Sequence, residues 1–231
     1  MTIDVNKYNK IVFFTGAGMS AESGVPTYRG SGGIWHKYDW EEFACQNAFE
    51  RNPTKVLDFH ELRRKSLLEC QTHKGHKFIS DLQKSHDSIT VVTQNIDGIH
   101  QRTGSENVIE LHGSLWRLRC DVCGITVDDI GESFTKKKCD CGKYLRPDII
   151  WFSDMLNPHV IQQASEAIQK CDLFISIGTS GVVWPAAGFP QVAKNNGAYC
   201  IEINTEQTEL SYLFDEVIFS KASEIERYLS F

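Results

Sequence analysis

The chain has 231 residues, of which 41% are hydrophobic, and a formal net charge of −6 at pH 7. This length suffices for one sizeable core and a small accessory module, while the negative charge excludes a general attraction to nucleic acid or to anionic membranes. No run approaches the roughly 18 apolar residues of a membrane span, and no charged segment precedes an apolar one near the start, so we expect a cytoplasmic monomer without anchor or secretion signal.

The first strong signal is a glycine-rich loop that follows an apolar run. Residues 11–14 are β-branched or aromatic, which predicts a buried strand. Gly16, Gly18 and Ala21 then match G-x-G-x-x-G/A, a pattern that lets a pyrophosphate approach and lets the next helix present its N–H groups. A tight turn without a ligand is the alternative. The glycine-rich residues 30–33 predict a mobile segment that could close as a lid.

Residues 40–85 have mostly helical spacing, with an interruption at 52–54 that divides two helices. We interpret this block as a helical insertion between the first and second strands of a doubly wound sheet.

Polar side chains follow the next two predicted strands. Residues 88–93 run into Gln94, Asn95 and Asp97, and the short strand 107–111 ends at His112. Open α/β sheets bind ligands at the carboxyl ends of their strands, although Asn95 and Asp97 would serve equally as helix caps. A lone histidine is more often structural, but this position suits a general base near neutral pH.

Four of the eight cysteines crowd into one short window, as Cys120-x-x-Cys123 and Cys139-x-Cys141. Two close pairs of thiolates across a polar loop are typical of a closed, structural zinc site. A disulfide pair or an iron–sulfur cluster is the alternative. In a reducing compartment this crowding favours a metal.

The rest of the chain predicts a repeating strand and helix pattern. Residues 144–154 return from the cysteine module to an apolar strand, and further strands are predicted at 172–177, 198–203 and 216–219. Helices are predicted at 158–170 and 185–195. Each apolar run ends in small or polar residues, as expected of a parallel sheet whose carboxyl edge binds a ligand.

Several motifs coincide in order, namely residues 16–30, residues 93–97, His112-Gly113, the four cysteines and residues 178–180. Together they resemble the sirtuins, the NAD-dependent protein deacylases, and within them the bacterial-type subgroup that removes succinyl and malonyl groups. The resemblance implies an α/β fold with a Rossmann-type doubly wound parallel sheet over residues 1–35, 86–115 and 150–231. A smaller domain would combine a helical module, residues 36–85, with a zinc module, residues 116–149.

The resemblance also implies NAD and one structural zinc as cofactors, acylated lysine on proteins as substrate, and His112 as the base that takes a proton from a ribose hydroxyl. The products would be deacylated lysine, nicotinamide and O-acyl-ADP-ribose. NAD would contact Gly16, Ala17, Gly18, Ser20, Ala21, Arg29, Gln94, Asn95, Asp97, Gly178, Thr179, Ser180, Asn204, Thr205 and Ala222. The substrate would contact Ala44, His60, Arg63, Trp151, Phe152, Ser153, Gly181, Val182 and Val183, pairing as a strand between 151–153 and 181–183. The zinc ligands would be Cys120, Cys123, Cys139 and Cys141.

The acyl preference depends on a pair in the helical module. The desuccinylase subgroup carries Tyr-x-x-Arg, which grips the distal carboxylate of the acyl group. The matching positions here are His60 and Arg63, one helical turn apart; Arg63 keeps the family residue, whereas His60 replaces the Tyr. Ala44 matches a small residue that widens the pocket. The alternative is that both are ordinary exposed helix residues. Ser153 and Asp154 also depart from the usual Gly-Glu of the family.

Two other functional classes stay open at this point. An ADP-ribosyltransferase or NAD glycohydrolase would release nicotinamide without removing an acyl group. A non-catalytic NAD-sensing module would bind NAD without releasing nicotinamide.

Overall fold

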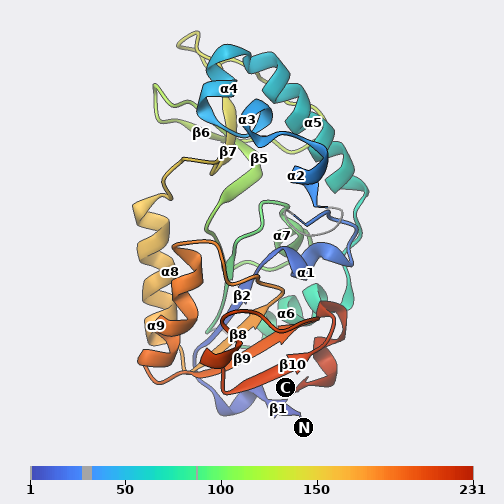
Figure 1. Ribbon diagram of the computed structural model, residues 1–231, viewed down its shortest axis with the longest axis vertical. Coiled ribbons are helices and arrows are strands. Elements are labelled where there is room, and N and C mark those ends of the chain that lie inside the picture. Colours follow the sequence, from blue (N-terminus) through green and yellow to red (C-terminus); the bar gives the residue numbers. More distant parts are fainter. Residues whose placement is uncertain (1, 28–32, 87, 231) are drawn as a thin grey trace.

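The computed structural model describes residues 2–27, 33–86 and 88–230. The predicted cofactor residue Arg29 and residues 30–32 of the predicted lid lie outside this part of the chain. The molecule is elongated, with a six-stranded sheet and its helices at one end and a smaller lobe at the other, and both termini lie at the sheet end (Figure 1). In the described residues, no helix combines the length and apolarity that crossing a membrane requires.

The six strands pair in parallel in the order β10-β9-β8-β2-β3-β4. Their bounds are β2 (Ile11–Thr15), β3 (Ile89–Thr93), β4 (Val108–Glu110), β8 (Leu173–Ile177), β9 (Tyr199–Asn204) and β10 (Glu216–Phe219). Six of the seven predicted apolar runs are thereby confirmed as strands of a doubly wound parallel sheet. The strand order reverses between β2 and β8, which is where such sheets leave a crevice for a ligand.

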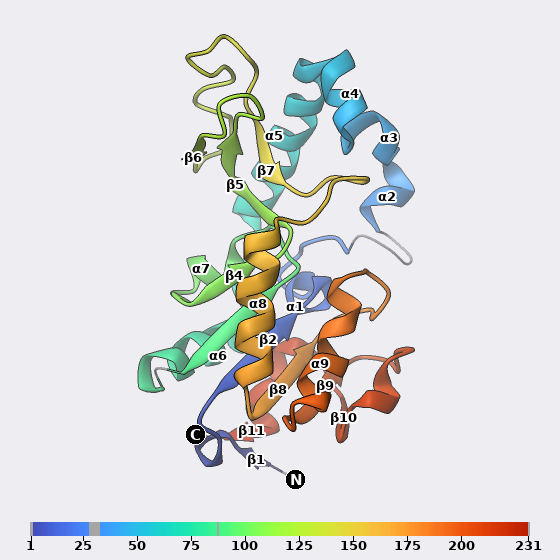
Figure 2. The ribbon, with the colours of Figure 1, turned by 90° about the vertical axis from the view of Figure 1, so that its left-hand side faces the viewer.

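Alternating side chains of β2 pack into two helical layers. Ile11 and Phe13 share a core with α6 (Lys74–Ser85), whereas Val12 and Phe14 face α8 (Pro158–Lys170) and α9 (Phe189–Asn195). This follows from the two-residue period of a strand. Figure 2 shows α8 and α9 side by side on one face, and the short helices α1 (Ala17–Ala21) and α7 (Ile99–Arg102) complete the other.

Helix α8 has the predicted bounds because Pro158 opens it and the Asn157 side chain accepts the N–H of His159 at 2.9 Å. The helix predicted at 185–195 begins later, since the 3₁₀ turn η2 (Ala186–Gly188) precedes α9. Further short elements are η1 (Val5–Lys7), η3 (Ser211–Leu213) and η4 (Ala222–Arg227). The strands β1 (Ile3–Asp4) and β11 (Leu229–Ser230) pair with each other near the two ends of the chain.

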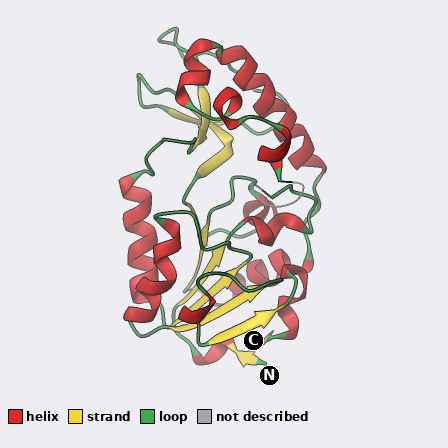
Figure 3. Cartoon of the chain, in the orientation of Figure 1, coloured by secondary structure: helices red, strands yellow, loops and turns green. Residues whose placement is uncertain are grey.

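We call the smaller part the small lobe. It consists of α2 (Ile34–Lys37), α3 (Trp40–Phe43), α4 (Gln46–Arg51) and α5 (Pro53–Glu69), together with the antiparallel sheet β6-β5-β7. The strands are β5 (Gly113–Arg119), β6 (Thr126–Asp128) and β7 (Arg146–Ile149), coloured yellow in the upper part of Figure 3. The predicted interruption at 52–54 is confirmed, because Asn52 caps α5 and Pro53 opens it. The predicted domain bounds stay a prediction; α6, within 36–85, packs on the six-stranded sheet.

The strand predicted over residues 144–154 is too long. Only Arg146–Ile149 pair in the sheet as β7. Beyond them the Asp154 carboxylate accepts the backbone N–H of Trp151 at 3.1 Å, which closes a turn. Ser153 has a φ of 71°, a left-handed conformation that no strand residue adopts. The apolar residues of this stretch therefore belong to an irregular segment.

Candidate functional site

A cavity of about 1020 Å³ lies between the carboxyl edge of the six-stranded sheet and the small lobe. Its size is at the upper end for small-molecule sites. Most predicted cofactor residues line it, as does His112: Gly16, Ala17, Gly18, Ala21, Gln94, Asn95, Gly178, Thr179, Ser180, Asn204, Thr205 and Ala222. Six predicted substrate residues line it too: Ala44, Arg63, Trp151, Phe152, Val182 and Val183.

Five described residues of the predicted site are not in the lining. Ser20, Asp97 and His60 are buried behind it, and Ser153 and Gly181 lie beside it. Ser20 and Asp97 lie behind the lining residues and form hydrogen bonds that hold this part of the site in place. The Ser20 hydroxyl accepts a hydrogen bond from the amide of Asn95 at 3.2 Å, and the Asp97 carboxylate accepts the N–H of Ile99 at 2.9 Å.

The glycines of the first loop are needed for contact with a second loop. A Cβ on Gly16 would lie 2.7 Å from the carbonyl oxygen of Gly178, and one on Gly18 would lie 2.6 Å from its Cα. The N–H of Gly18 donates to that same carbonyl at 2.9 Å. The sequence predicted that the space above these glycines and the N–H groups beside them serve a pyrophosphate. In the structure, the loop after β2 instead packs against the loop after β8 at Gly178. A ligand would therefore lie along their joint surface.

His112 is held with one nitrogen committed. Its Nδ1 lies 2.8 Å from the carbonyl oxygen of Gln94, which can only accept, so Nδ1 carries the proton and Nε2 keeps its lone pair. Burial lowers the pKa of His112, and the bond to Gln94 opposes this only in part. The imidazole is therefore neutral near pH 7 and can accept a proton at the edge of the cavity.

Asn95 is fixed by the ends of two strands. Its amide donates to the carbonyl of Gly16 at 2.9 Å, and its backbone N–H donates to the Thr93 hydroxyl at 3.1 Å. That hydroxyl also accepts from Thr15 at 2.8 Å. Asn95 thus links β2 and β3, whereas Asp97 precedes the N-cap residue Gly98 of α7 and accepts the N–H of Ile99, the first residue of that helix. Burial raises the pKa of Asp97.

His60 and Arg63 are both on α5 but end in different environments. Arg63 lines the cavity, as does Ala44. His60 is fully buried, and its Nε2 accepts the indole N–H of Trp151 at 3.3 Å. His60 is therefore not an exposed helix residue, and it contacts Trp151 in the cavity wall.

Several lining residues were not predicted from the sequence. They are Glu22 and Thr27 in the glycine-rich motif, Trp35 on α2, Trp184 before α9, and Glu206 and Glu209 after β9. Position alone could have indicated the last two, because they follow a strand end that was already assigned to the site.

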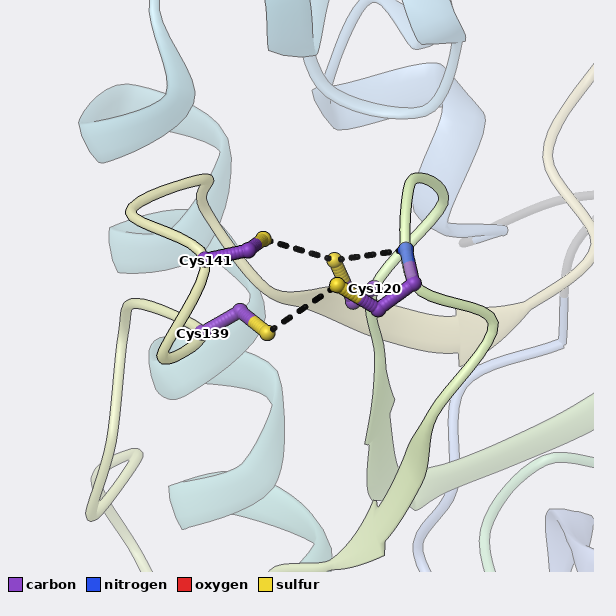
Figure 4. A group of neighbouring side chains, drawn as sticks. Cys120, Cys139 and Cys141 are labelled. Atoms are coloured by element: carbon purple, nitrogen blue, oxygen red, sulfur yellow. Dashed lines mark hydrogen bonds between the residues drawn. The ribbon is translucent and has the colours of Figure 1, made fainter.

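The four predicted metal ligands converge in the small lobe. Their sulfurs all lie within 4.8 Å of one another, with Cys120 to Cys141 at 3.7 Å and Cys123 to Cys139 at 3.9 Å. A tetrahedron with Zn–S bonds of about 2.3 Å has S–S edges of about 3.8 Å. Figure 4 shows the side chains from the two loops pointing toward one another. All four are free cysteines, so the set fits zinc and the disulfide alternative is wrong.

Comparisons with known proteins agree with this geometry. The family model described as Sir2 family matches residues 16–185. An NAD-dependent protein deacylase of Aquifex aeolicus (strain VF5) is 43% identical over 216 residues, covering 92% of this chain and 90% of the relative. NAD-dependent protein deacylase 1 of Archaeoglobus fulgidus is 40% identical over 227 residues, covering 97% and 92%.

Among solved structures, a mutant Sir2 homologue in complex with ADP-ribose superposes with a TM-score of 0.89 at 39% identity, covering 96% of this chain and 90% of that one. A complex of a Sir2 homologue with NAD gives 0.86 at 40% identity, covering 96% and 88%.

Proposed function

Because this chain belongs to the Sir2 family, we propose that it is an NAD-dependent protein deacylase with its reaction centre at His112. NAD would lie along the strand-end loops of β2, β8 and β9, and the acylated lysine would enter between Trp151 and Arg63. The observation that carries this proposal is the neutral imidazole of His112, whose Nε2 can accept a proton. It lies at the edge of a cavity that is also lined by both glycine loops.

NAD as cosubstrate supplies a ribose carbon whose nicotinamide can leave and a ribose hydroxyl that can receive the acyl group. The loops at Gly16 and Gly178 are locked to each other and orient what lies on them. The aromatic walls at Trp151 and Phe152 exclude water from the reacting groups. His112 Nε2 accepts the hydroxyl proton. With one water consumed when the lysine amine leaves, the products would be nicotinamide, deacylated lysine and O-acyl-ADP-ribose.

Zinc has a structural task in this proposal. Cys120, Cys123, Cys139 and Cys141 complete a tetrahedron by themselves, so no position is open for a substrate. The metal would hold together the two loops of the small lobe.

The substrate backbone would pair between residues 151–153 and 181–183. The N–H of Phe152 already donates to the carbonyl of Ala44 at 3.0 Å. This bond ties Phe152 to the small lobe, so the peptide would pair along a segment whose inner side is fixed.

The test is mass spectrometry of acetyl, succinyl and longer acyl-lysine peptides with and without NAD. Wild-type protein should remove an acyl group only when NAD is present. His112→Ala should lower the rate by about 10²- to 10⁴-fold while calorimetry still detects NAD binding. Near-normal turnover by the variant would remove His112 from this role. Nicotinamide release without deacylation would favour a transferase or glycohydrolase, and NAD binding without release would favour a sensing module.

We further propose that acidic acyl groups are preferred, because Arg63 brings a permanent charge to the cavity. Arg63→Met should reduce the ratio of succinyl to acetyl turnover by about tenfold to a hundredfold, since a hydrogen bond to a charged group contributes roughly 1.5–3 kcal/mol. Lys65→Met is the matched control on the same helix, since Lys65 is exposed and paired with Glu132 at 3.0 Å. Equal losses on both substrates would exclude Arg63 as the reader of the carboxylate.

A further inference from the structure

Trp151 forms part of the cavity wall, and three neighbouring side chains contact its indole ring. Only 3% of the residue is exposed, although it lines the cavity. Its indole N–H donates to His60 Nε2 at 3.3 Å, and the Arg146 guanidinium lies 3.5 Å from the ring centroid. Phe49 packs against the same ring with a centroid distance of 5.4 Å. A side chain held in this way has one available orientation.

Arg146 and Asp154 lock the backbone of the same residue. Arg146 is 2% exposed; its Nη2 donates to the Asp154 carboxylate at 2.7 Å and to the carbonyl of Ile149 at 3.0 Å. The oxygen of Asp154 that accepts from Arg146 also accepts the N–H of Trp151. The ion pair of Arg146 and Asp154 therefore fixes the main chain of Trp151, and the guanidinium of the pair stacks on its ring.

His60 supplies the remaining constraint, because it is the hydrogen-bond partner of the indole. To accept from an N–H, its Nε2 must be unprotonated. Burial, with Arg63 and Arg146 adding repulsion, holds the pKa of His60 well below its usual value. His60 therefore remains an acceptor throughout the neutral range, and it makes this contact from the helix that also carries Arg63.

We propose that His60 is a positioning residue that determines acyl specificity through Trp151. This inference rests on the proposed deacylase function and changes the expected role of His60, which does not grip the acyl carboxylate. We call the part of the cavity lined by Ala44, Arg63 and Trp151 the acyl channel. The indole fixed by His60 sets the width of this channel, and Arg63, one turn further along α5, sets its charge. The channel then favours short acyl groups with a terminal carboxylate and excludes long acyl chains.

The contact is tested by NMR of the protein labelled with ¹⁵N at the indole nitrogens. The chain has five tryptophans, so five indole signals are expected, and Trp151→Phe identifies the one of interest. His60→Leu removes the acceptor and should move that signal, whereas His60→Gln keeps an acceptor and should leave it near its place. Leu67→Ala, buried two turns along the same helix, controls for general loosening of α5.

The role is tested by kinetics on succinyl and hexanoyl peptides. A buried N–H that has lost its partner is unfavourable, so the indole should leave its position in His60→Leu, and kcat/KM for the succinyl peptide should fall by about tenfold. The hexanoyl peptide should lose less, and the KM for NAD should stay unchanged. His60→Gln should restore the discrimination between the two peptides, which a merely structural role would not predict.

Three results would overturn the proposal. An indole signal that does not move in His60→Leu would show that the contact is absent. A moved signal with unchanged discrimination would confine His60 to stability. If the wild type removed no acyl group, the proposed function would fail and the specificity role with it, although the NMR signal would still establish the contact.

Discussion

The two walls of the cavity are built by different means. The wall formed by the six-stranded sheet depends on the absence of side chains: Gly16 and Gly18 lie against Gly178, and their N–H groups donate to the carbonyls of Ile177 and Gly178. The wall formed by the small lobe depends on side chains, including the Arg64–Asp129 pair and the cysteine cluster. Substitutions in the small lobe can therefore change the substrate specificity, while the sheet wall keeps one geometry for the cosubstrate.

Removing the metal should have the largest effect, and this effect should be confined to the small lobe. Cys139→Ser takes one ligand from the cluster, and metal binding in small zinc modules is worth about 10 kcal/mol or more of folding free energy. We expect loss of bound zinc by elemental analysis and loss of deacylation. NAD binding should persist within a few-fold by calorimetry, because the sheet wall contains no metal ligand among the described residues.

Cys45→Ser is the control for this experiment, since Cys45 is a free cysteine in the small lobe outside the cluster. It should retain zinc and activity. A zinc-free Cys139→Ser protein whose β5–β7 amides remained as protected from hydrogen exchange as in the wild type would contradict the proposed role of the metal.

The Arg64–Asp129 pair should be the next most important element of the small lobe. The two side chains are 0% and 1% exposed, with Nη2 at 2.8 Å from the carboxylate, and Arg64 also stacks on Phe134 at 4.4 Å. Removing one partner of such a pair leaves a buried charge, which costs about 3–5 kcal/mol. Asp129→Asn should therefore lower the free energy of unfolding by that amount, as measured by urea titration.

The nearby pair of Lys65 and Glu132 provides the matched comparison. Both side chains are more than half exposed and 3.0 Å apart. Glu132→Gln should change the free energy of unfolding by less than about 1 kcal/mol. Equal effects of the two substitutions would mean that the buried pair does not hold α5 to the zinc loops.

Gly178→Ala tests the sheet wall. The added Cβ would lie 2.4 Å from the backbone nitrogen of Met19, and the φ of Gly178 is +62°. Overpacking against backbone costs about 1–3 kcal/mol and the left-handed conformation about 1 kcal/mol more. Gly197→Ala has a φ of +86° but nothing within 4 Å, so it carries the second cost alone. NAD affinity should fall in the first variant and not in the second; equal affinities would contradict loop-to-loop packing.

The sequence was sufficient to predict the sheet because parallel strands are buried on both faces and give uninterrupted apolar runs. The five residues of β2 are all buried, and side chains from both of its faces enter separate cores. The four cysteines were equally predictable, since a closed metal site needs nothing beyond its own ligands.

Two parts of the site could not be predicted in this way. Residues three apart on a helix differ in direction by about 60°, which is enough to bury His60 and bring Arg63 to the cavity. The glycine spacing indicates that something approaches closely, but it cannot distinguish a ligand from Gly178, which comes from a distant strand. In both cases the missing information is what the side chain or loop packs against.

Acid should lower the free energy of unfolding through two buried histidines that pack on the six-stranded sheet. This is the smallest effect we expect. The rings of His76 and His100 pack edge to face with centroids 5.0 Å apart, and His100 contacts the Thr15 hydroxyl at 3.1 Å. Burial lowers the pKa of His76 to about 2 and that of His100 to about 4. Both are therefore neutral in the folded state at pH 5.5, whereas in the unfolded chain both would be protonated.

Because the unfolded state then binds more protons, the free energy of unfolding should fall as the pH drops below about 6.5, by roughly 1 kcal/mol per histidine between pH 7 and 5.5. Urea titrations across this range should show a slope reduced by about one proton in His76→Gln. His159→Gln, at an exposed position, should leave the slope unchanged. If His76→Gln did not reduce the slope, His76 would take up its proton in the folded state. The core around the six-stranded sheet would then accommodate a buried charge, contrary to this prediction.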